Sequence, residues 1–506
     1  MLTRLKVSGF KNLVDVDVRF GPFTCIAGPN AVGKSNLFDA ILFLSALADH
    51  PLMAAAQSVR GDENGARISD IRGLFHRCGD DYASEMSFEA EMIIPSEGED
   101  DLGDKAKATI TFLRYSLRLG YRNDENSGSF GSLEVLHEEL DRITLRDAAG
   151  HLLFRHTPKW RKSAIHGRRA AKFISTEGSG ERTFIKLHQD GGSRGKPLST
   201  RQAKNLPRTV LCAANTAESS TALLARQEMR SWRLLQLEPS AMRRPDEFSA
   251  PTKLGSDGSN LAATLYRLAY QNGSRPRDAG NPRVCADVAR RLAQLIDDVR
   301  TVSIDRDEKR DLLTLNVMAA DKTPHAARSL SDGTLRFLAL AVLEQDPEFQ
   351  GVLCLEEPEN GIHPARIPAM IGLLRDIATD VNEPVGPDNP LRQVIVNTHS
   401  PVVVQLVPDD ALLVALPAEM VDSGMRFSGV RFNSLPSTWR AKGSSEKTHT
   451  CKIGDLLVYL NPVIRSEEDG DETVTTSHLH TGKVRKIRRV IDRPDVAPYF
   501  SGLEPI

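Results

Sequence analysis

The hydrophobic pattern of the first fifty residues predicts strands, then a loop, then a helix. Residues 14–18 alternate apolar and acidic side chains, as a half-buried strand does, and Phe23–Ala27 is a short apolar run typical of a buried strand. After a loop, apolar residues recur at helical spacing at Leu37, Ala40, Ile41 and Leu44. We therefore expect residues 2–27 to form two antiparallel strands that lead into the loop.

The middle of the chain changes from strand-like to helix-like patterning. Within residues 84–190, three stretches alternate or are rich in β-branched and aromatic residues: Met86–Ile94, Ala108–Tyr121 and Thr183–His188. Within residues 217–300, helical spacing recurs in three apolar sets: Leu223, Leu224, Met229, Trp232, Leu234 and Leu235; Leu261, Leu265, Leu268 and Ala269; and Val288, Leu292 and Leu295. Because heptads are not sustained, we expect no long coiled coil.

After residue 301, strand and helix patterns alternate. In order, the pattern predicts a strand at Leu312–Val317, a helix from about residue 330 to Leu343, a strand at Val352–Leu355, a helix over about 364–377 and a buried strand that starts at Val394. Strands that alternate with helices favour an α/β fold.

Composition limits the class of protein. With 506 residues the chain is long enough for two to four domains or sub-domains, and its 65 basic and 67 acidic side chains balance, so that any nucleic-acid contact must come from a local patch. No apolar run approaches the length of about 18 residues that spans a bilayer. The start of the chain has no signal-peptide core, and the six cysteines form no C-x-x-C pair. We expect a cytoplasmic protein without a membrane partner.

A phosphate-binding motif occupies the loop between the second predicted strand and the first helix. Gly28, Gly33, Lys34 and Ser35 stand at the fixed positions of the pattern G-x-x-x-x-G-K-[ST]. Backbone N–H groups of such a loop, at a helix start, bind phosphate oxygens. Lys34 would neutralise the β- and γ-phosphates and Ser35 would ligate Mg²⁺. The residues expected to bind nucleotide here are Asn30, Ala31, Val32, Gly33, Lys34, Ser35 and Asn36.

The turn before this loop is harder to interpret. Lys6, Phe10, Lys11 and Asn12 stand between the first two strands, where they could contact an adenine or a ribose. A solvated turn is the other interpretation.

Two acids and a histidine follow buried strands later in the chain. Glu356 would make an outer-shell contact with the Mg²⁺ held by Ser35, and Glu357 would orient or deprotonate the attacking water. His399 ends the next buried strand, so it should lie beside Glu357 at the carboxyl edge of the sheet and could bond the γ-phosphate. The predicted catalytic residues are Glu357 and His399, and the predicted metal-binding residues are Ser35 and Glu356.

Four segments in this order resemble the ABC-type ATPase heads of the RecF/SMC/OLD grouping: Gly28–Asn36, Leu330–Leu335, Leu355–Pro364 and Asn397–Pro401. The resemblance implies ATP and Mg²⁺ as cofactors and an α/β head with a mixed sheet. It divides the chain into 1–83 and 301–430 as the two parts of the head, 84–300 as an inserted region and 431–506 as an extension.

The same resemblance implies a homodimer. Two heads would meet face to face, and Ser331 and Gly333 at the signature of one chain would grip the γ-phosphate of the ATP bound by the other. Glu359, Asn360 and His363 would lie near this seam. Asp332 stands where transporters usually have glycine.

Three function classes compete. The first is a DNA-linked or antiviral-defence ATPase whose nucleotide state controls a separate effector chain, with direct DNA repair as a variant. The second, a transporter subunit, is disfavoured by the long segment between Lys34 and Ser331. The third, an OLD-like ATPase-nuclease, needs a metal-binding acid set, and Asp469 and Asp471 stand in a polar loop with no strand and Glu before them.

Two basic segments leave a nucleic-acid partner open. Residues 154–176 carry seven Lys and Arg side chains around Trp160 without an acid, and residues 483–489 are similarly basic. Either segment could bind nucleic acid or an acidic partner, or be a solvated face.

Overall fold

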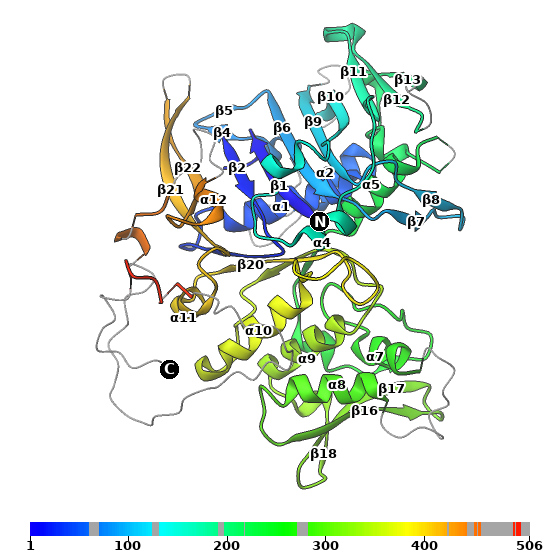
Figure 1. Cartoon of the computed structure of the whole chain (residues 1–506), viewed down its shortest axis with the longest axis vertical. Helices are drawn as coiled ribbons and strands as arrows, with labels where there is room; N and C mark the ends of the chain where they lie inside the picture. The colour runs from blue at the N-terminus through cyan, green and yellow to red at the C-terminus, as the bar shows by residue number, and fades with distance from the viewer. Residues whose placement is uncertain are drawn as a thin grey trace.

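The computed structural model describes residues 1–59, 70–123, 131–190, 197–216, 218–270, 282–422, 425–442, 450–452, 454–456, 489–490 and 492–496. The predicted mixed α/β fold is confirmed: two large sheets stack with helices between and below them, and a smaller sheet closes the lower end (Figure 1). Within the described residues no long coiled coil is present, and no helix is long and apolar enough to cross a membrane.

The first large sheet has eight antiparallel strands in the order β13-β12-β11-β10-β9-β6-β1-β2. Its strands are β1 (Leu2–Ser8), β2 (Val16–Arg19), β6 (Glu85–Ile93), β9 (Phe112–Arg122), β10 (Ser132–Arg142), β11 (Ile174–Glu177), β12 (Phe184–His188) and β13 (Pro197–Gln202). The antiparallel pair β1–β2 and the strands at 86–94, 108–121 and 183–188 are thus confirmed, with shifted ends. β10 escaped prediction because a bulge between Val135 and His137 breaks its alternation.

The second large sheet carries the phosphate-loop strand. Its order is β14-β19-β20-β3-β21-β22, and all neighbours except the last pair are parallel. Its strands are β14 (Arg233–Leu235), β19 (Gly351–Glu356), β20 (Arg392–Thr398), β3 (Phe23–Ala27), β21 (Leu412–Asp422) and β22 (Met425–Ser434). β3, β19 and β20 are nearly continuous apolar runs because helices cover both faces of this sheet.

One predicted helix is shorter than its pattern. The apolar set from Leu223 to Leu235 was expected to be one helix, but α5 (Ser220–Arg230) ends before Trp232, and β14 pairs with β19 instead. A strand of three residues has too few positions to display a period of two, so parallel pairing overrides the local pattern. β14 lies within the range 84–300 and is nevertheless an edge strand of the sheet that holds the phosphate loop.

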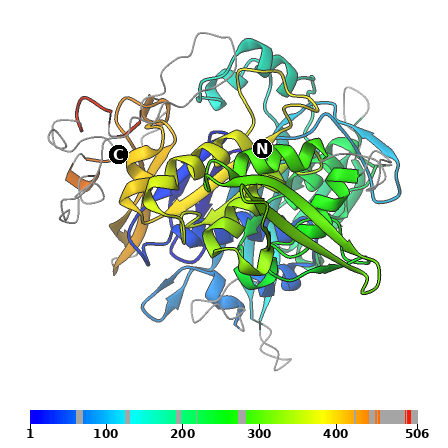
Figure 2. The same cartoon turned by 90° about the horizontal axis from the view of Figure 1, so that it is seen from below.

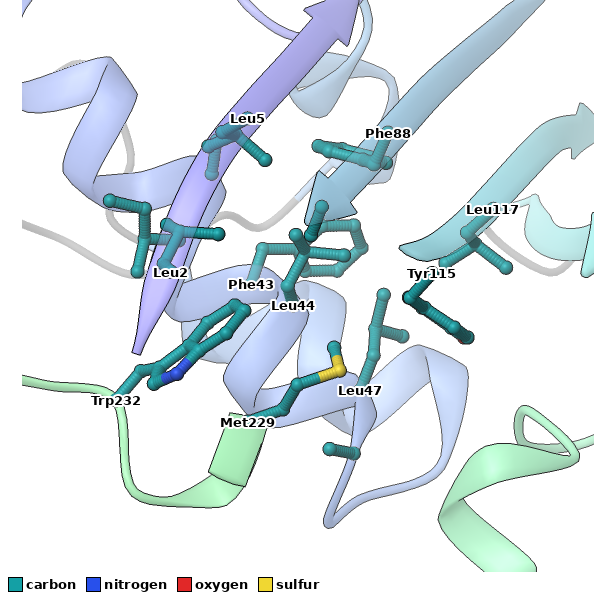
Figure 3. Close-up of a cluster of buried hydrophobic side chains, with 14 of the residues drawn as sticks. Leu2, Leu5, Phe43, Leu44, Leu47, Phe88, Tyr115, Leu117, Met229 and Trp232 are labelled. Carbon is teal, nitrogen blue, oxygen red and sulfur yellow. The ribbon is translucent and has the colours of Figure 1, made fainter. Parts of the chain in front are cut away.

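Helix α1 (Lys34–Leu47) lies between the two large sheets and joins them through one core. Its Phe43, Leu44 and Leu47 pack against Leu2 and Leu5 of β1 and against Phe88, Tyr115 and Leu117 of β6 and β9, together with Met229 and Trp232 (Figure 3). Because α1 starts at the phosphate loop, this packing places the loop against the antiparallel sheet as well as against its own sheet.

The opposite face of the parallel sheet is covered by a second helical layer. α9 (Asp332–Glu344), α10 (Ile367–Ile377) and α11 (Pro401–Leu406) share a core with the small sheet and with α7 (Leu261–Tyr270) and α8 (Arg283–Leu292). The small sheet contains β15 (Asp246–Glu247), β16 (Val299–Asp307), β17 (Leu312–Ala319) and β18 (Pro324–Ala326). Seen from below, yellow and green helical segments form the layer in front (Figure 2).

Shorter elements fill the connections. The helices are α2 (Leu52–Ser58), α3 (Ala148–His151), α4 (Pro158–Ala164), α6 (Pro239–Met242) and α12 (Trp439–Lys442), with 3₁₀ turns at Ile71–Leu74, Gly180–Arg182, Ala203–Asn205, Leu211–Ala213, Ala327–Ser329 and Pro364–Arg366. Two small hairpins pair β4 (Arg77–Cys78) with β5 (Asp81–Tyr82) and β7 (Glu97–Glu99) with β8 (Lys105–Lys107).

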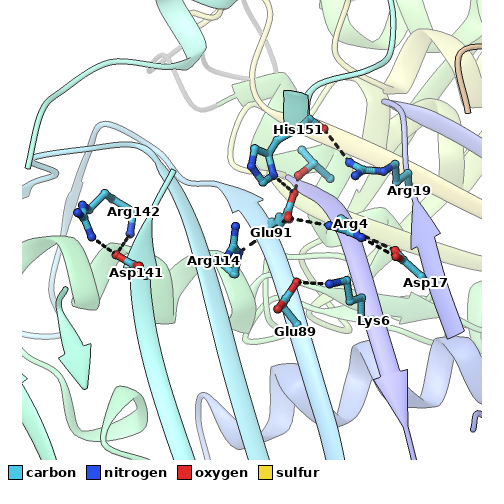
Figure 4. Close-up of polar contacts among 11 residues, drawn as sticks. Arg4, Lys6, Asp17, Arg19, Glu89, Glu91, Arg114, Asp141, Arg142 and His151 are labelled. Atoms are coloured by element: carbon cyan, nitrogen blue, oxygen red, sulfur yellow. Dashed lines mark hydrogen bonds and ion pairs between the residues drawn. The ribbon is translucent and has the colours of Figure 1, made fainter. Parts of the chain in front are cut away.

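A buried carboxylate ties the strands of the antiparallel sheet together. Glu91 on β6 faces Arg4 at 3.3 Å and the Nδ1 of His151 at 2.8 Å, and Arg4 also bonds Asp17 on β2 (Figure 4). Burial alone would raise the pKa of Glu91, but the hydrogen bond to His151 and the nearby cations outweigh it, so that its pKa is lowered. The network fixes β1, and with it the turn that follows β1.

Candidate functional site

The loop from Gly28 to Lys34 joins the end of β3 to the start of α1, as expected. A Cβ at Gly28 would lie 2.6 Å from the Ala415 carbonyl oxygen on β21, so the close neighbouring strand requires glycine here. Ala31 and Gly33 adopt positive φ angles of 62° and 110°. Left-handed residues that alternate with right-handed ones turn successive N–H groups to one side, which makes a concave anion-binding backbone.

Lys34 lies across this loop. Its Nζ donates to the carbonyl oxygens of Gly28 and Pro29, both at 2.7 Å. Burial lowers the pKa of Lys34, and the charges of Glu357 and Glu356 act in the opposite direction, which places both carboxylates near the ammonium group. The side chain that would neutralise phosphates is therefore already at the loop and beside the two acids.

The order of the parallel strands brings the acids to the loop. β20 lies between β3 and β19, and Asn397 on β20 is in register with both Ile26 and Glu356. Asn397 Nδ2 donates to Glu356 Oε1 at 3.4 Å. Since Ser35 opens α1 with an exposed side chain, Glu356 and Ser35 face the same carboxyl edge of the sheet.

These residues fit a magnesium site completed by phosphate. Among the described residues, no three His, Cys, Asp or Glu side chains form a cluster that could enclose a metal. Mg²⁺ commonly takes only one or two protein ligands and completes its octahedron with water and phosphate oxygens. A hydroxyl from Ser35 and a carboxylate from Glu356 next to an anion-binding loop are a donor set of this kind.

Glu357 is held in a strained conformation by its neighbours. Its φ is 46°, which costs a residue with a Cβ about 1–2 kcal/mol. Its N–H donates to the Asn397 carbonyl oxygen at 3.0 Å, its Oε1 lies 2.5 Å from His399 Nδ1, and its Oε2 accepts from Asn360 Nδ2 at 2.9 Å. The predicted proximity of Glu357 and His399 is present in the structure.

Glu359 is a buried acid whose contacts the pattern did not reveal. Its exposed fraction is 8%, and Oε1 accepts from the Thr398 hydroxyl, whereas Oε2 has no hydrogen-bond partner among the described residues. Burial raises the pKa of Glu359, and the charge of Glu357 adds to this shift.

Ser331 and Gly333 form a different corner of the structure. Ser331 caps α9 by accepting from the Thr334 N–H at 3.3 Å, and a Cβ at Gly333 would lie 2.1 Å from the Gly361 carbonyl oxygen. Asp332, the departure from the transporter pattern, pairs with Arg243 at 2.5 Å. Within the described residues, no hydrogen bond joins Ser331 or Gly333 to residues 28–36 of the same chain.

Comparison with known proteins identifies the family. The model of the family described as "AAA domain, putative AbiEii toxin, Type IV TA system" matches residues 23–132 and 225–405, which together are more than half of the chain. The chain belongs to this AAA family. Its resemblance to the ABC-type ATPase heads of the RecF/SMC/OLD grouping is confirmed.

Curated relatives match this family member over short segments. DNA replication and repair protein RecF of Porphyromonas gingivalis is 33% identical over 76 residues, which are 15% of this chain and 20% of the relative. RecF of Parabacteroides distasonis is 35% identical over 65 residues, 13% of this chain and 18% of the relative. The OLD nuclease of Thermus scotoductus is 49% identical over 41 residues, 8% of each chain. The matches span a fifth or less of each relative's length.

Solved structures that align over most of this AAA-family chain are SMC heads. The SMC head bound to the C-terminal winged-helix domain of ScpA is 14% identical over 85% of this chain and 97% of its own, with a TM-score of 0.42. The SMC head domain from Thermotoga maritima is 13% identical over 85% of this chain and 97% of its own, with a TM-score of 0.32.

The turn before the phosphate loop of this AAA-family chain is not a solvated turn. Phe10 is fully buried, and Lys11 is buried with its Nζ 2.8 Å from Asp39 on α1. Asn12 reaches the phosphate loop itself, where its Nδ2 donates to the Val32 carbonyl oxygen at 3.0 Å. Motif spacing could not reveal this contact because it joins two different sheets.

The first basic segment divides into inward and outward residues. Trp160 on α4 is fully buried and cannot stack on a base, and Lys172 pairs with Glu139 at 2.6 Å. The exposed cations are Arg155, Lys159, Arg161, Lys162 and Arg168. Residues 469–471 and the second basic segment, 483–489, lie outside the described residues apart from Arg489, which pairs with Asp492.

Proposed function

We propose that this chain binds ATP with Mg²⁺ and hydrolyses it at the carboxyl edge of the parallel sheet. One observation carries the proposal: three adjacent strands bring together Glu356 and Glu357 at the end of β19, His399 after β20, and Lys34 at the start of the helix that follows β3. A cation over an anion-binding loop, next to a carboxylate that is held by a histidine, is the arrangement that phosphoryl transfer to water requires.

Each residue then has a defined task. The N–H groups of the loop and Lys34 would hold the phosphates, while Ser35 would ligate Mg²⁺ and Glu356 would make an outer-shell contact with it. The ion would supply positive charge that offsets the negative charge developing on the phosphate oxygens. Glu357 accepts a proton from the attacking water, and His399 orients Glu357 through its Nδ1–H. Only a doubly protonated imidazole could also donate from Nε2 to the γ-phosphate.

The complete site would need two chains. Ser331 and Gly333 would bind the γ-phosphate of the ATP held by a second head, as a helix N-terminus can. This assignment is supported by their position at the start of α9, with no hydrogen bond to their own phosphate loop among the described residues. ATP would close the homodimer, and hydrolysis would open it.

The nucleotide state would regulate a separate effector chain in a DNA-linked or antiviral-defence process. The family description, which names an AbiEii toxin, and relatives named as DNA replication and repair proteins support this role. Direct DNA binding is the second candidate. The exposed cations on and beside α4 favour it, because they could contact a phosphate backbone.

The deciding experiment measures the ATPase rate per chain against protein concentration, with and without duplex DNA. A rate that rises with concentration supports sites shared between two chains. A flat rate in a protein that light scattering shows to be monomeric would contradict the dimer. If wild type hydrolyses ATP no faster than Lys34→Ala, the proposed hydrolysis is wrong. Stimulation of the rate by DNA would favour direct DNA binding, the second candidate.

A further inference from the structure

Asn12 connects the antiparallel sheet to the phosphate loop. It belongs to the turn between β1 and β2, and its side-chain amide uses both of its ends: Nδ2 donates to the Val32 carbonyl oxygen at 3.0 Å, and Oδ1 accepts from Asn36 Nδ2 at 2.8 Å. A Cβ placed on Gly33 would lie 2.3 Å from Asn12 Nδ2. The amide is thus in direct contact with the back of the loop.

The contact has a consequence for the loop's polarity. An anion-binding loop works only if its N–H groups point inward, and each peptide plane that does so points its carbonyl outward. Asn12 gives the outward carbonyl of Val32 a donor, and this bond stabilises the orientation in which the next N–H group, that of Gly33, faces the phosphates. An aspartate could not donate to this carbonyl, and it would add a negative charge beside the phosphates.

The turn that carries Asn12 is fixed without the help of its amide. Lys11 donates its N–H to the Leu74 carbonyl oxygen at 2.9 Å, accepts at its own carbonyl from His76 Nδ1 at 2.7 Å, and pairs with Asp39 on α1. Lys11 also has a positive φ of 47°, which these three contacts hold in place. Removing the Asn12 side chain should therefore leave the turn folded and affect only the phosphate loop.

We propose that Asn12 is a positioning residue for nucleotide binding: it pre-organises the phosphate loop from the antiparallel sheet, through Val32 and Asn36. The proposal rests on the proposed function, since it concerns the loop that would bind ATP. It also assigns a role to the turn that sequence patterns left open between a base contact and a solvated loop. Asn12 acts on the loop's backbone rather than on adenine or ribose.

The test compares Asn12→Ala and Asn12→Asp with wild type and with Asn205→Ala. Asn205 is an exposed asparagine whose amide donates to the nearby Gln202, so it controls for loss of a surface amide. Calorimetric titration with ATP should show binding that is about tenfold weaker in Asn12→Ala and still weaker in Asn12→Asp. The KM for ATP should rise with binding, while kcat at saturating ATP stays within about twofold.

A readout without nucleotide separates this proposal from the proposed function. Hydrogen exchange of the amides in residues 30–36 should be faster in Asn12→Ala than in Asn205→Ala, at equal thermal midpoints. Equal exchange, or equal ATP affinity, would overturn the role of Asn12 while leaving ATP binding by Lys34 intact. If wild type and Lys34→Ala both fail to bind ATP, the proposed function fails, and the exchange result alone decides whether Asn12 orders the loop.

Discussion

Two regions of the molecule are built from different kinds of contact: the phosphate-loop edge, which contains Lys34, Glu357 and His399, and the signature corner, which contains Ser331 and Gly333. At the first, His399 pairs with Glu357, Lys34 lies across the loop that follows β3, and Glu357 adopts a strained backbone angle that its neighbours maintain. At the second, Ser331 caps a helix, and Gly333 packs on the backbone of Gly361. The first arrangement brings charged groups of one chain together, whereas the second presents a capped helix start, whose proposed ligand would be held by another chain.

Asn360 joins the two regions. Its side chain donates to Glu357, and its carbonyl accepts from Arg336 on α9 at 2.8 Å. A movement of α9, which Ser331 caps, would therefore displace Asn360 and change its contact with Glu357. The difference between the regions shows that the proposed hydrolytic residues and the proposed signature lie on separate elements. The short loop that contains Asn360 contacts both.

The largest effect is expected from Lys34→Ala. Because a charge-assisted contact to phosphates would be lost, ATP affinity should fall by about 100-fold or more, as measured by calorimetric titration. Lys159→Ala, which removes an exposed lysine on α4, is the matched control and should bind as wild type. If Lys34→Ala binds ATP within about threefold of the control, the proposed role of Lys34 in phosphate binding is wrong.

The next effect is expected from Glu357→Gln. The amide keeps the shape of the side chain but cannot take a proton from water, so the hydrolysis rate should fall by about 10²–10⁴-fold while ATP still binds. Single-turnover assays measure this, and Glu383→Gln at an exposed position serves as the control. A variant that turns over at the wild-type rate would show that Glu357 is not the base.

Mixing two inactive variants tests whether the signature corner acts on a partner. Ser331→Arg and Lys34→Ala should each be inactive, but a mixed dimer would keep one intact phosphate loop facing one intact signature. An equal mixture should recover about a quarter of the wild-type rate, because about half of the dimers are mixed and each has one working site.

Loss of the Ser331 cap costs about 1 kcal/mol of helix stability, so Ser331→Thr, which retains a capping hydroxyl, is the control for folding. No recovery on mixing, with the dimers shown to exchange chains, would confine the site to one chain.

The smallest effect is expected from Glu359→Gln. Burial raises the pKa of Glu359 above its usual value of 4.5, so this carboxyl favours folding at low pH, and its contribution declines as the pH rises through the folded-state pKa. The glutamine variant should therefore lose less stability than wild type as the pH rises from 4.5. Urea unfolding between pH 4 and 8 measures it, and parallel curves would contradict the raised pKa.

Sequence patterns were most informative for elements whose structure follows from the residues within the element itself. β3, β19 and β20 were predicted because strands buried on both faces are continuous apolar runs, and α9 because its apolar residues follow helical spacing. β10 and β14 were missed because a bulge and a length of three residues hide their period. For the candidate site, motif spacing placed Lys34 at the phosphate loop and predicted that His399 lies beside Glu357, but it did not reveal that Asn360 also contacts Glu357.

The sequence by itself determined most of the elements, the phosphate-loop motif and the family resemblance, since these depend on residues close together in the chain. Only the tertiary structure decided that β20 lies between β3 and β19, that Glu359 is buried with one oxygen unpaired among the described residues, and that Asn12 supports the loop from another sheet. The physical reason is that strand order and contacts between sheets are set by burial and pairing among residues distant in the chain. Burial and pairing between distant residues leave no pattern in a short stretch of sequence.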